Sequence, residues 1–366
     1  MTERIYFDWN GHAPLVAAAK AAMCEMLALG NASAVHADGR EARRHIETAR
    51  RVLADSLGAD SANIIFTASG TEANNLALHN ARGRPVLLAA SEHESVLRPA
   101  LEQQAILFPL DSHGLPDLLG LEEALTRHPR AFVAAMLANN ETGVLWPIAE
   151  IAALVHRHGG LLHCDASQAF GRMPVDIDAL GADFLTVSAH KMGGPLGAAA
   201  LVLARDQAIV PLLQGGGQER GRRAGTENGP ALVGFAAAIL DGYRDWQKTR
   251  RLRDHLEDIV REVDPRARIF GEDRARLDNT TCFALSAGSG HSLVIACDLA
   301  GIGISAGAAC SSGTVKPSRV LQAMGVDEAT ARRALRISLG PTNTEDEVSR
   351  FRQVVRERCG MLESAA

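Results

Sequence analysis

A lysine follows an apolar run at a point where a solvated turn residue would be the commoner choice. The run 184-FLTVSA-189 is followed by His190 and Lys191, and then by two glycines and a proline. Glycines beside the lysine would let a large group approach the backbone. A lysine whose neutral amine can be reached can form a Schiff base with an aldehyde. We therefore interpret Lys191 as a candidate for covalent chemistry, with an exposed turn lysine as the alternative.

An aspartate ends the preceding apolar run, in 160-GLLHCDASQAFG-171. A buried carboxylate is costly unless a cation or hydrogen bonds accompany it. The protonated ring nitrogen of a cofactor is one such partner, because a carboxylate that keeps a pyridine protonated lets the ring withdraw electrons. The alternative is that Asp165 only caps the next turn.

Two glycine-containing segments could bind an anion. In 67-TASGTEANN-75, Gly70 and Thr71 open a helical pattern after an apolar run. Free N–H groups at a helix start bind phosphate well, although Ser69 or Thr71 could be a plain N-cap. The segment 215-GGGQERGRRAGTEN-228 places arginines among glycines, which favours either an anion-binding loop or a flexible surface linker.

Cys310 differs from the other cysteines in its surroundings. It lies in 303-GISAGAACSSG-313, where small neighbours give access rather than burial, so we interpret it as a reactive nucleophile. Cys164, Cys282 and Cys297 lie in more apolar surroundings and are expected to be inert buried thiols. The six cysteines have no CxxC spacing, and we expect no metal site.

Alternating apolar runs and helical patterns predict the elements that position these side chains. Strands are predicted at 63–67, 86–90, 131–137, 160–165, 184–189 and 198–204, and helices at 71–80, 94–104, 118–128 and 147–158. Apolar strands with helical crossovers indicate a mostly parallel sheet covered on both faces, and the short link before the last strand favours an antiparallel final strand. Ligands bind at the carboxyl ends of such strands, which is where Thr67, His93, Asn140, Asp165 and Lys191 fall.

The sequence pattern changes after about residue 250. A charged helix, two weaker strands and an amphipathic final helix are predicted at 249–263, 281–286, 333–339 and 345–358. We expect a small α/β domain formed by residues 251–366 together with residues 1–15, beside a large domain over residues 16–250.

The composition excludes several classes of partner. The net charge is −5 over 366 residues with both signs mixed, which argues against nucleic acid and against a polybasic membrane anchor. No apolar run reaches membrane-spanning length, and the start MTERIYFDWNGHAP has no apolar core of a signal peptide. With scattered cysteines as well, we expect a cytoplasmic protein with reduced thiols.

Together these segments resemble the cysteine desulfurases (NifS- and IscS-like), within the class V aminotransferase superfamily of fold-type I pyridoxal phosphate enzymes. The motifs that carry the resemblance span nearly the whole chain in the family's order: YFDW, NASAVHADGREA, FTASGTEANN, SEHESVL, ANNETG, HCDASQAFG, SAHKMGGPLG, GGGQERGRRAGTEN, AGAACSSG and RISLG. The resemblance implies an α/β fold with a seven-stranded, mostly parallel sheet in a large domain and a small carboxyl-terminal α/β domain. It also implies a homodimer.

The resemblance further implies roles around pyridoxal 5′-phosphate, the family's cofactor. Lys191 would hold the cofactor covalently, and Asp165 would pair with its ring nitrogen. His93, from SEHESVL, would stack on the ring and help to move protons. Gln168 and Asn140 would hydrogen-bond the phenolic oxygen.

The phosphate and the substrate would have their own residues in this resemblance. The phosphate would be held by Gly70, Thr71, Ser188 and His190. Thr226 would reach the phosphate held by the partner subunit, which makes the 215–228 segment a dimer feature. Arg336, in RISLG, would grip the substrate carboxylate as a bidentate clamp, with Asn140 nearby.

The activity implied is the removal of sulfur from L-cysteine, which gives L-alanine and a persulfide on Cys310. The sulfur would pass to an iron–sulfur scaffold or another acceptor protein, and the cysteine loop resembles the longer type that delivers sulfur directly. Three alternatives stand beside this hypothesis: a selenocysteine lyase, another class V aminotransferase-type enzyme, and a weakly catalytic sulfur-trafficking protein. Cys310 argues against an aminotransferase, which needs no thiol nucleophile.

Two segments depart from the family pattern. Trp9-Asn10-Gly11-His12-Ala13 stands where relatives have small and hydroxyl residues near the substrate, so substrate preference and rate could differ here. Ala68-Ser69-Gly70 replaces the usual Ser-Gly-Ala order at the phosphate loop, a small backbone change that we expect to be tolerated.

Overall fold

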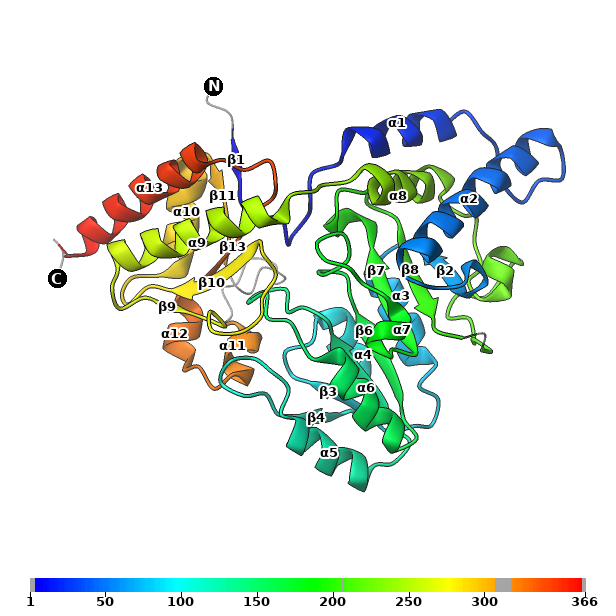
Figure 1. The fold of residues 1–366 in the computed structure, drawn as a ribbon, viewed down its shortest axis with the longest axis horizontal. Helices are drawn as coiled ribbons and strands as arrows, with labels where there is room; N and C mark the ends of the chain where they lie inside the picture. The colour runs from blue at the N-terminus through cyan, green and yellow to red at the C-terminus, as the bar shows by residue number, and fades with distance from the viewer. Residues whose placement is uncertain (1–3, 206, 307–316, 364–366) are drawn as a thin grey trace.

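The computed structural model describes residues 4–205, 207–306 and 317–363, and it has a larger and a smaller lobe (Figure 1). Cys310 lies outside the described residues. None of the described helices is both long enough and apolar enough to cross a membrane.

The larger lobe is built on a seven-stranded sheet in the order β2-β8-β7-β6-β5-β3-β4. Its strands are β2 (Ile64–Thr67), β3 (Val86–Ala89), β4 (Ile106–Phe108), β5 (Phe132–Met136), β6 (Leu161–Asp165), β7 (Phe184–Ser188) and β8 (Ala199–Leu203). All neighbours are parallel except β8, which runs antiparallel to both β2 and β7. The prediction of a mostly parallel sheet with an antiparallel final strand is confirmed, and β4 is the strand that the sequence did not indicate.

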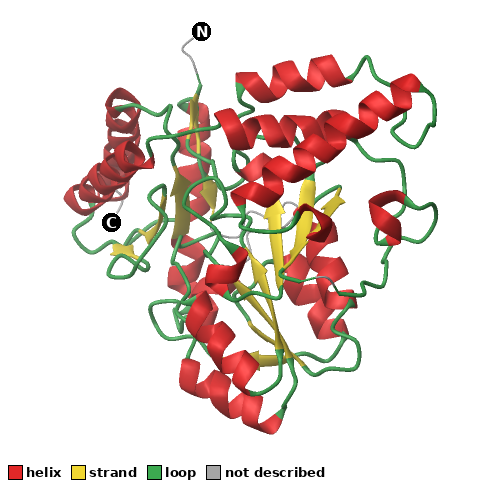
Figure 2. Ribbon diagram, turned by 45° about the vertical axis from the view of Figure 1, so that its right-hand side comes forward, coloured by secondary structure: helices red, strands yellow, loops and turns green. Residues whose placement is uncertain are grey.

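Helices cover both faces of this sheet, as Figure 2 shows. They are α1 (Ala17–Met26), α2 (Ala37–Ser56), α3 (Gly70–His79), α4 (Glu94–Glu102), α5 (Leu118–Arg127), α6 (Ile148–Arg157), α7 (Ile177–Leu180) and α8 (Gly229–Asp241). Successive strand residues face opposite sides, so Ile65 packs in the cluster that contains α3 and α4, while Ile64 packs in the cluster that contains α2, α6 and α8. Burial on both faces explains the uninterrupted apolar runs.

The smaller lobe contains an antiparallel sheet in the order β12-β13-β10-β9. Its strands are β9 (Arg268–Ile269), β10 (Thr280–Ala284), β12 (Ser305–Ala306) and β13 (Ala334–Ser338), and its helices are α9 (Trp246–Val263), α10 (Gly290–Leu299), α11 (Arg319–Ala323), α12 (Glu328–Arg333) and α13 (Glu345–Glu363). One apolar cluster joins α9, α10 and α13 to this sheet.

The amino-terminal segment packs with the smaller lobe before it crosses to the larger one. Strand β1 (Ile5–Tyr6) pairs in parallel with β11 (Ile302–Gly303), and Phe7 lies in the apolar core of the smaller lobe. Six residues later, the N–H of Ala13 donates to the backbone oxygen of His190 in the larger lobe at 2.9 Å. This packing supports our proposed division into domains of residues 16–250 and of residues 1–15 with 251–366.

Candidate active site

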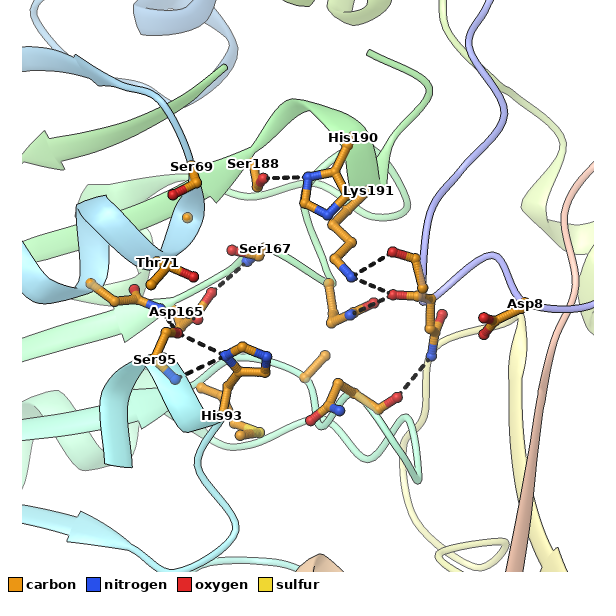
Figure 3. Close-up of a pocket in the computed structure, with 18 of the residues that line it drawn as sticks. Asp8, Ser69, Thr71, His93, Ser95, Asp165, Ser167, Ser188, His190 and Lys191 are labelled. Atoms are coloured by element: carbon orange, nitrogen blue, oxygen red, sulfur yellow. Dashed lines mark hydrogen bonds between the residues drawn. The ribbon is translucent and has the colours of Figure 1, made fainter. Parts of the chain in front are cut away.

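A cavity of about 360 Å³ lies at the carboxyl ends of the parallel strands (Figure 3). It gathers side chains from both lobes. Ten residues singled out from the sequence line it: Gly70, Thr71, His93, Asn140, Asp165, Gln168, Ser188, His190, Lys191 and Arg336. Thr226 is exposed and is not among the lining residues, and Cys310 lies outside the described part of the chain.

Lys191 ends a single 3-10 turn (Ala189–Lys191) that directly follows β7. Its amine donates to the backbone oxygens of Asn10 at 2.5 Å and Gly11 at 3.0 Å, inside the cavity. Lys191 is half-buried, so it is not an exposed turn lysine.

The glycines beside Lys191 allow a tight turn and also the close approach of a large group, because a Cβ on Gly193 would lie 2.8 Å from the ring of Tyr243. Gly193 has a φ of +93°, a conformation that other residues rarely adopt. A Cβ on Gly194 would lie 2.8 Å from the Cβ of Ala189. The tight turn follows β7 directly, and the side chain of Lys191 reaches from it to the backbone oxygens of Asn10 and Gly11.

Asp165 lies at the end of β6 with its carboxylate in the cavity. One carboxylate oxygen accepts from the backbone N–H of Ser167 at 2.9 Å, and the other accepts from the amide of Asn74 at 2.8 Å. The aspartate therefore caps the next turn and also presents a negative charge to the cavity. The two interpretations of Asp165, as a cap of the next turn and as a partner for a cofactor ring nitrogen, are therefore compatible.

His93 is the N-cap of α4, and its ring enters the cavity from the side opposite Lys191 (Figure 3). Its Nδ1 accepts from the backbone N–H of Ser95 at 3.2 Å and lies 2.7 Å from the Ser95 hydroxyl. Burial lowers the pKa of His93, the negative charge of Asp165 opposes this shift, and the positive charge of Lys191 adds to it. His93 is therefore a neutral ring at neutral pH.

The amino terminus of α3 supplies the predicted anion site. Ser69 is its N-cap and accepts from the N–H of Glu72 at 3.1 Å, which leaves the N–H groups of Gly70 and Thr71 beside the cavity. Ser188 completes this wall with a hydroxyl 2.9 Å from Nδ1 of His190. Burial, and then the charge of Lys191, lowers the pKa of His190 to about 4.

Arg336, on β13, forms the opposite wall of the cavity and is buried. It donates to a carboxylate oxygen of Asp8 at 2.6 Å and to the backbone oxygen of Asn140 at 3.1 Å. Its Nε is buried without a hydrogen-bond partner among the described residues. The sequence did not indicate the pairing with Asp8, which lines the same cavity.

Arg172 is a buried cation that the sequence interpretation missed. One terminal nitrogen donates to the side-chain oxygens of Asn10 at 2.6 Å and Gln168 at 2.9 Å, and the other donates to the backbone oxygens of Trp9 and Lys191, both at 3.1 Å. Burial, and then the charge of Arg336, lowers its pKa to about 9. The four-residue spacing from Gln168 to Arg172 was the available signal in the sequence.

Asn10, in the segment that departs from the family pattern, connects the two lobes. Its amide donates to Thr280 at 2.9 Å and to the backbone oxygen of Asn140 at 3.2 Å. Its backbone oxygen accepts from Lys191 and, at 3.1 Å, from Gln168. The side chain of Asn10 therefore makes the inter-lobe contacts, whereas its contact with Lys191 uses a backbone oxygen that any residue would supply.

The 215–228 segment is held by ion pairs to the larger lobe. Glu219 is buried and paired with Arg50 at 2.7 Å, and Arg223 pairs with Glu72 of α3 at 2.7 Å. The alternative of a flexible linker with solvated charges is wrong for these side chains. The segment instead braces the helix that carries the anion site.

The thiols expected to be inert are buried. Cys164, Cys282 and Cys297 are each 0% exposed. Burial is the main cause that raises the pKa of each thiol. Within the part of the chain that the structure describes, no cluster of histidine, cysteine and acidic side chains could hold a metal ion.

A seven-stranded α/β sheet with a lysine, an aspartate and a helix start around one cavity defines an enzyme of the fold-type I pyridoxal phosphate class. The family model for class-V aminotransferases matches residues 5–351, and the chain belongs to this family, among its cysteine desulfurases.

Relatives and solved structures agree on this assignment. A cysteine desulfurase of Cereibacter sphaeroides is 40% identical over 96% of this chain and 95% of its own length. An IscS-like cysteine desulfurase of Mycobacterium tuberculosis is 39% identical over 96% of this chain and 95% of its own length. The X-ray structure of a NifS-like protein from Rickettsia africae has a TM-score of 0.90 at 35% identity and covers 97% of this chain and 99% of its own.

Pyridoxal 5′-phosphate is the cofactor of this family, and the residues present fit it. The cavity contains an amine for its aldehyde, a carboxylate for its ring nitrogen and free N–H groups at a helix start for its phosphate. Gly70 leaves room there, since a Cβ would lie 3.5 Å from Ser167 Oγ and Ser188 Cβ, in ordinary contact.

Proposed function

We propose that this protein is a cysteine desulfurase that takes sulfur from L-cysteine and releases L-alanine. The observation that carries the proposal is the convergence of Lys191, Asp165 and His93 on one cavity whose far wall is the guanidinium of Arg336. An amino-acid substrate needs a cation for its carboxylate, and Arg336 supplies it beside the amine of Lys191. The names of the near-full-length relatives support the same activity.

Each side chain has a proposed task at the cofactor. Lys191 would bind it covalently, and Asp165 would keep its ring nitrogen protonated. Gly70, Thr71, Ser188 and His190 would hold the phosphate, and Gln168 and Asn140 would bond the phenolic oxygen. When bound, pyridoxal 5′-phosphate withdraws electrons from the α- and β-carbons of an attached amino acid. His93 and Lys191, on opposite sides of the cavity, are placed to move protons.

The sulfur transfer balances without an added oxidant or reductant. The thiolate of Cys310 attacks the sulfur of L-cysteine and forms an S–S bond, and the C–S bond to the substrate's β-carbon breaks. The electron pair of that bond stays on the β-carbon, which gains a proton, so the carbon becomes the methyl group of alanine. Cys310 then carries a persulfide, and this sulfur passes to an acceptor thiol.

The cellular context is part of the proposal. We infer a cytoplasmic homodimer in which Thr226 contacts the phosphate held by the partner subunit, and exposed Thr226 is available for such a contact. The sulfur acceptor is a protein, either an iron–sulfur scaffold or another sulfur carrier. We expect neither nucleic acid nor a membrane as a partner.

The experiment is to incubate the purified holoenzyme with L-cysteine and a thiol reductant and to measure sulfide and alanine. We expect equal amounts of both, and we expect Cys310→Ala to release no sulfide while it keeps the visible absorbance of the cofactor. Cys24→Ala is the matched control, because Cys24 is an exposed thiol on α1, and it should behave as wild type. Sulfide release that survives in Cys310→Ala would refute the proposed nucleophile.

A further inference from the structure

The side chains that surround His93 form a hydrogen-bonded chain that reaches Asp165. Ser95 lies next to His93, and Asn74 of α3 lies between Ser95 and Asp165. The amide nitrogen of Asn74 is 2.9 Å from the Ser95 hydroxyl and 2.8 Å from a carboxylate oxygen of Asp165. Asn74 and Ser95 are both buried, so water does not compete for these bonds.

The direction of each hydrogen bond follows from the chemistry of its atoms. An ionised carboxylate only accepts, so Asn74 turns its amino group toward Asp165. The same amino group donates to the oxygen of Ser95. Because that oxygen already accepts a proton from Asn74, the serine's own O–H is available for Nδ1 of His93, 2.7 Å away.

A second donor reaches the same ring nitrogen. The backbone N–H of Ser95 points to Nδ1 of His93 at 3.2 Å, and a backbone N–H can only donate. Nδ1 therefore carries a lone pair. In a neutral imidazole the other nitrogen then holds the proton, so Nε2–H is the group left on the cavity side of the ring.

We propose that Ser95 and Asn74 are positioning residues that fix His93 as the Nε2–H tautomer, so that the resting enzyme presents a hydrogen-bond donor to the cavity. The inference rests on the proposed role of His93 in moving protons. It adds a direction to that role: the resting His93 donates a hydrogen bond through Nε2–H, and Lys191 is left as the base on the other side of the cavity.

The charges around His93 are compatible with this tautomer. Asp165 and Glu94 favour a protonated ring, whereas burial, Lys191 and Arg319 oppose it, and the balance lowers the pKa of His93. A second proton on Nδ1 would also face the N–H and O–H groups of Ser95. The Ser95 hydroxyl thus stabilises the neutral ring specifically.

The test is nitrogen NMR of the holoenzyme labelled with 15N-histidine, with the His93 signals assigned from their loss in His93→Gln. We expect a proton bonded to Nε2 and none bonded to Nδ1 in wild type. In Ser95→Ala we expect both tautomers, and a rise of about one unit in the pH at which His93 protonates. Ser95→Thr retains a hydroxyl and should restore the wild-type pattern.

A serine outside the site provides the control for Ser95→Ala. Ser292→Ala removes a hydroxyl of α10 that donates to the backbone oxygen of Ser289, the N-cap of that helix, and it should leave the His93 signals unchanged. A proton on Nδ1 in wild type, or an unchanged tautomer and titration in Ser95→Ala, would overturn the inference. The NMR signals are measured without substrate turnover. A negative desulfurase assay would therefore count against the proposed function and not against the tautomer of His93.

Discussion

The guanidinium of Arg336 and the carboxylate of Asp8 form an ion pair of 2.6 Å inside the cavity, between two segments of the smaller lobe. Asp8 follows β1, and Arg336 lies in β13. The arginine that we propose to bind the substrate carboxylate therefore already has a carboxylate partner. A substrate at this position competes with Asp8 for the same donor, or it uses the buried Nε that has no partner among the described residues.

This competition predicts the effect of Asp8→Asn. The variant removes the rival charge and leaves a neutral side chain of the same shape, so we expect KM for L-cysteine to fall by about tenfold, which corresponds to about 1.4 kcal/mol. Steady-state kinetics will measure it. Asp278→Asn is a matched control, since Asp278 pairs with Arg250 away from the cavity, and its KM should not change. A higher KM in Asp8→Asn would mean that Asp8 helps to bind the substrate.

The position of the Lys191 amine predicts the site of the cofactor bond. Treatment of the holoenzyme with borohydride should fix the cofactor irreversibly on the single peptide that contains Lys191, as read by mass spectrometry. Lys191→Ala should give no such adduct. Lys248→Ala, which changes a lysine bonded to the backbone oxygen of Pro341, should give the wild-type adduct. An adduct that persists in Lys191→Ala would place the attachment elsewhere.

The sequence predicted the residues that lie at strand ends because burial leaves a strong local signal. Strands β5 and β7 are buried along their whole length and β6 is buried at its three central residues, so their apolar runs were visible. Asp165 is the last residue of β6, and Lys191 ends the turn that follows β7. Strand β4 has three residues, of which Ile106 is partly buried and Leu107 is exposed, so its pattern was too short and too exposed to be found.

Contacts between distant segments could not be read in the same way. Asn10 bonds Asn140 and Thr280, and these partners depend on how the two lobes pack rather than on any local pattern. The glycines after Lys191 illustrate a different limit. Their composition indicated freedom of approach, and the ring of Tyr243 does lie against Gly193, but the +93° φ of Gly193 is a second requirement that the residue type alone does not distinguish.

The hydrogen bonds of Arg172 predict that it holds the cofactor site in shape. Arg172→Met would leave the buried side-chain oxygen of Gln168 without its donor, at a cost of about 1–3 kcal/mol, and would leave that of Asn10 with Asn279 as its remaining donor. We expect at least tenfold weaker retention of the cofactor, measured by absorbance after dialysis against a series of cofactor concentrations. Arg172→Lys keeps the charge but not the planar guanidinium, so its retention of the cofactor should lie between that of wild type and that of Arg172→Met. Wild-type retention in Arg172→Met would assign the arginine a role in packing only.

The buried carboxyl group of Glu92 predicts a pH dependence of stability. One of its oxygens accepts from the N–H of Met136 at 2.8 Å, and the other is buried without a partner among the described residues. Burial, together with the negative charge of Asp165, raises the pKa of Glu92 to about 8. The folded protein thus binds this proton more tightly than the unfolded chain, whose carboxyl group has an ordinary pKa near 4.5.

The sign of the effect follows from this difference in proton binding. Between pH 4.5 and about 8 the folded state holds a proton that the unfolded state has lost, so Glu92 lowers the free energy of unfolding as the pH rises, by at most about 1.4 kcal/mol for each unit. Glu92→Gln keeps the acceptor for Met136 but cannot ionise. We expect its urea midpoint to match wild type near pH 5 and to exceed it increasingly up to pH 8. A difference between the two proteins that does not depend on pH would show that Glu92 does not titrate in this window.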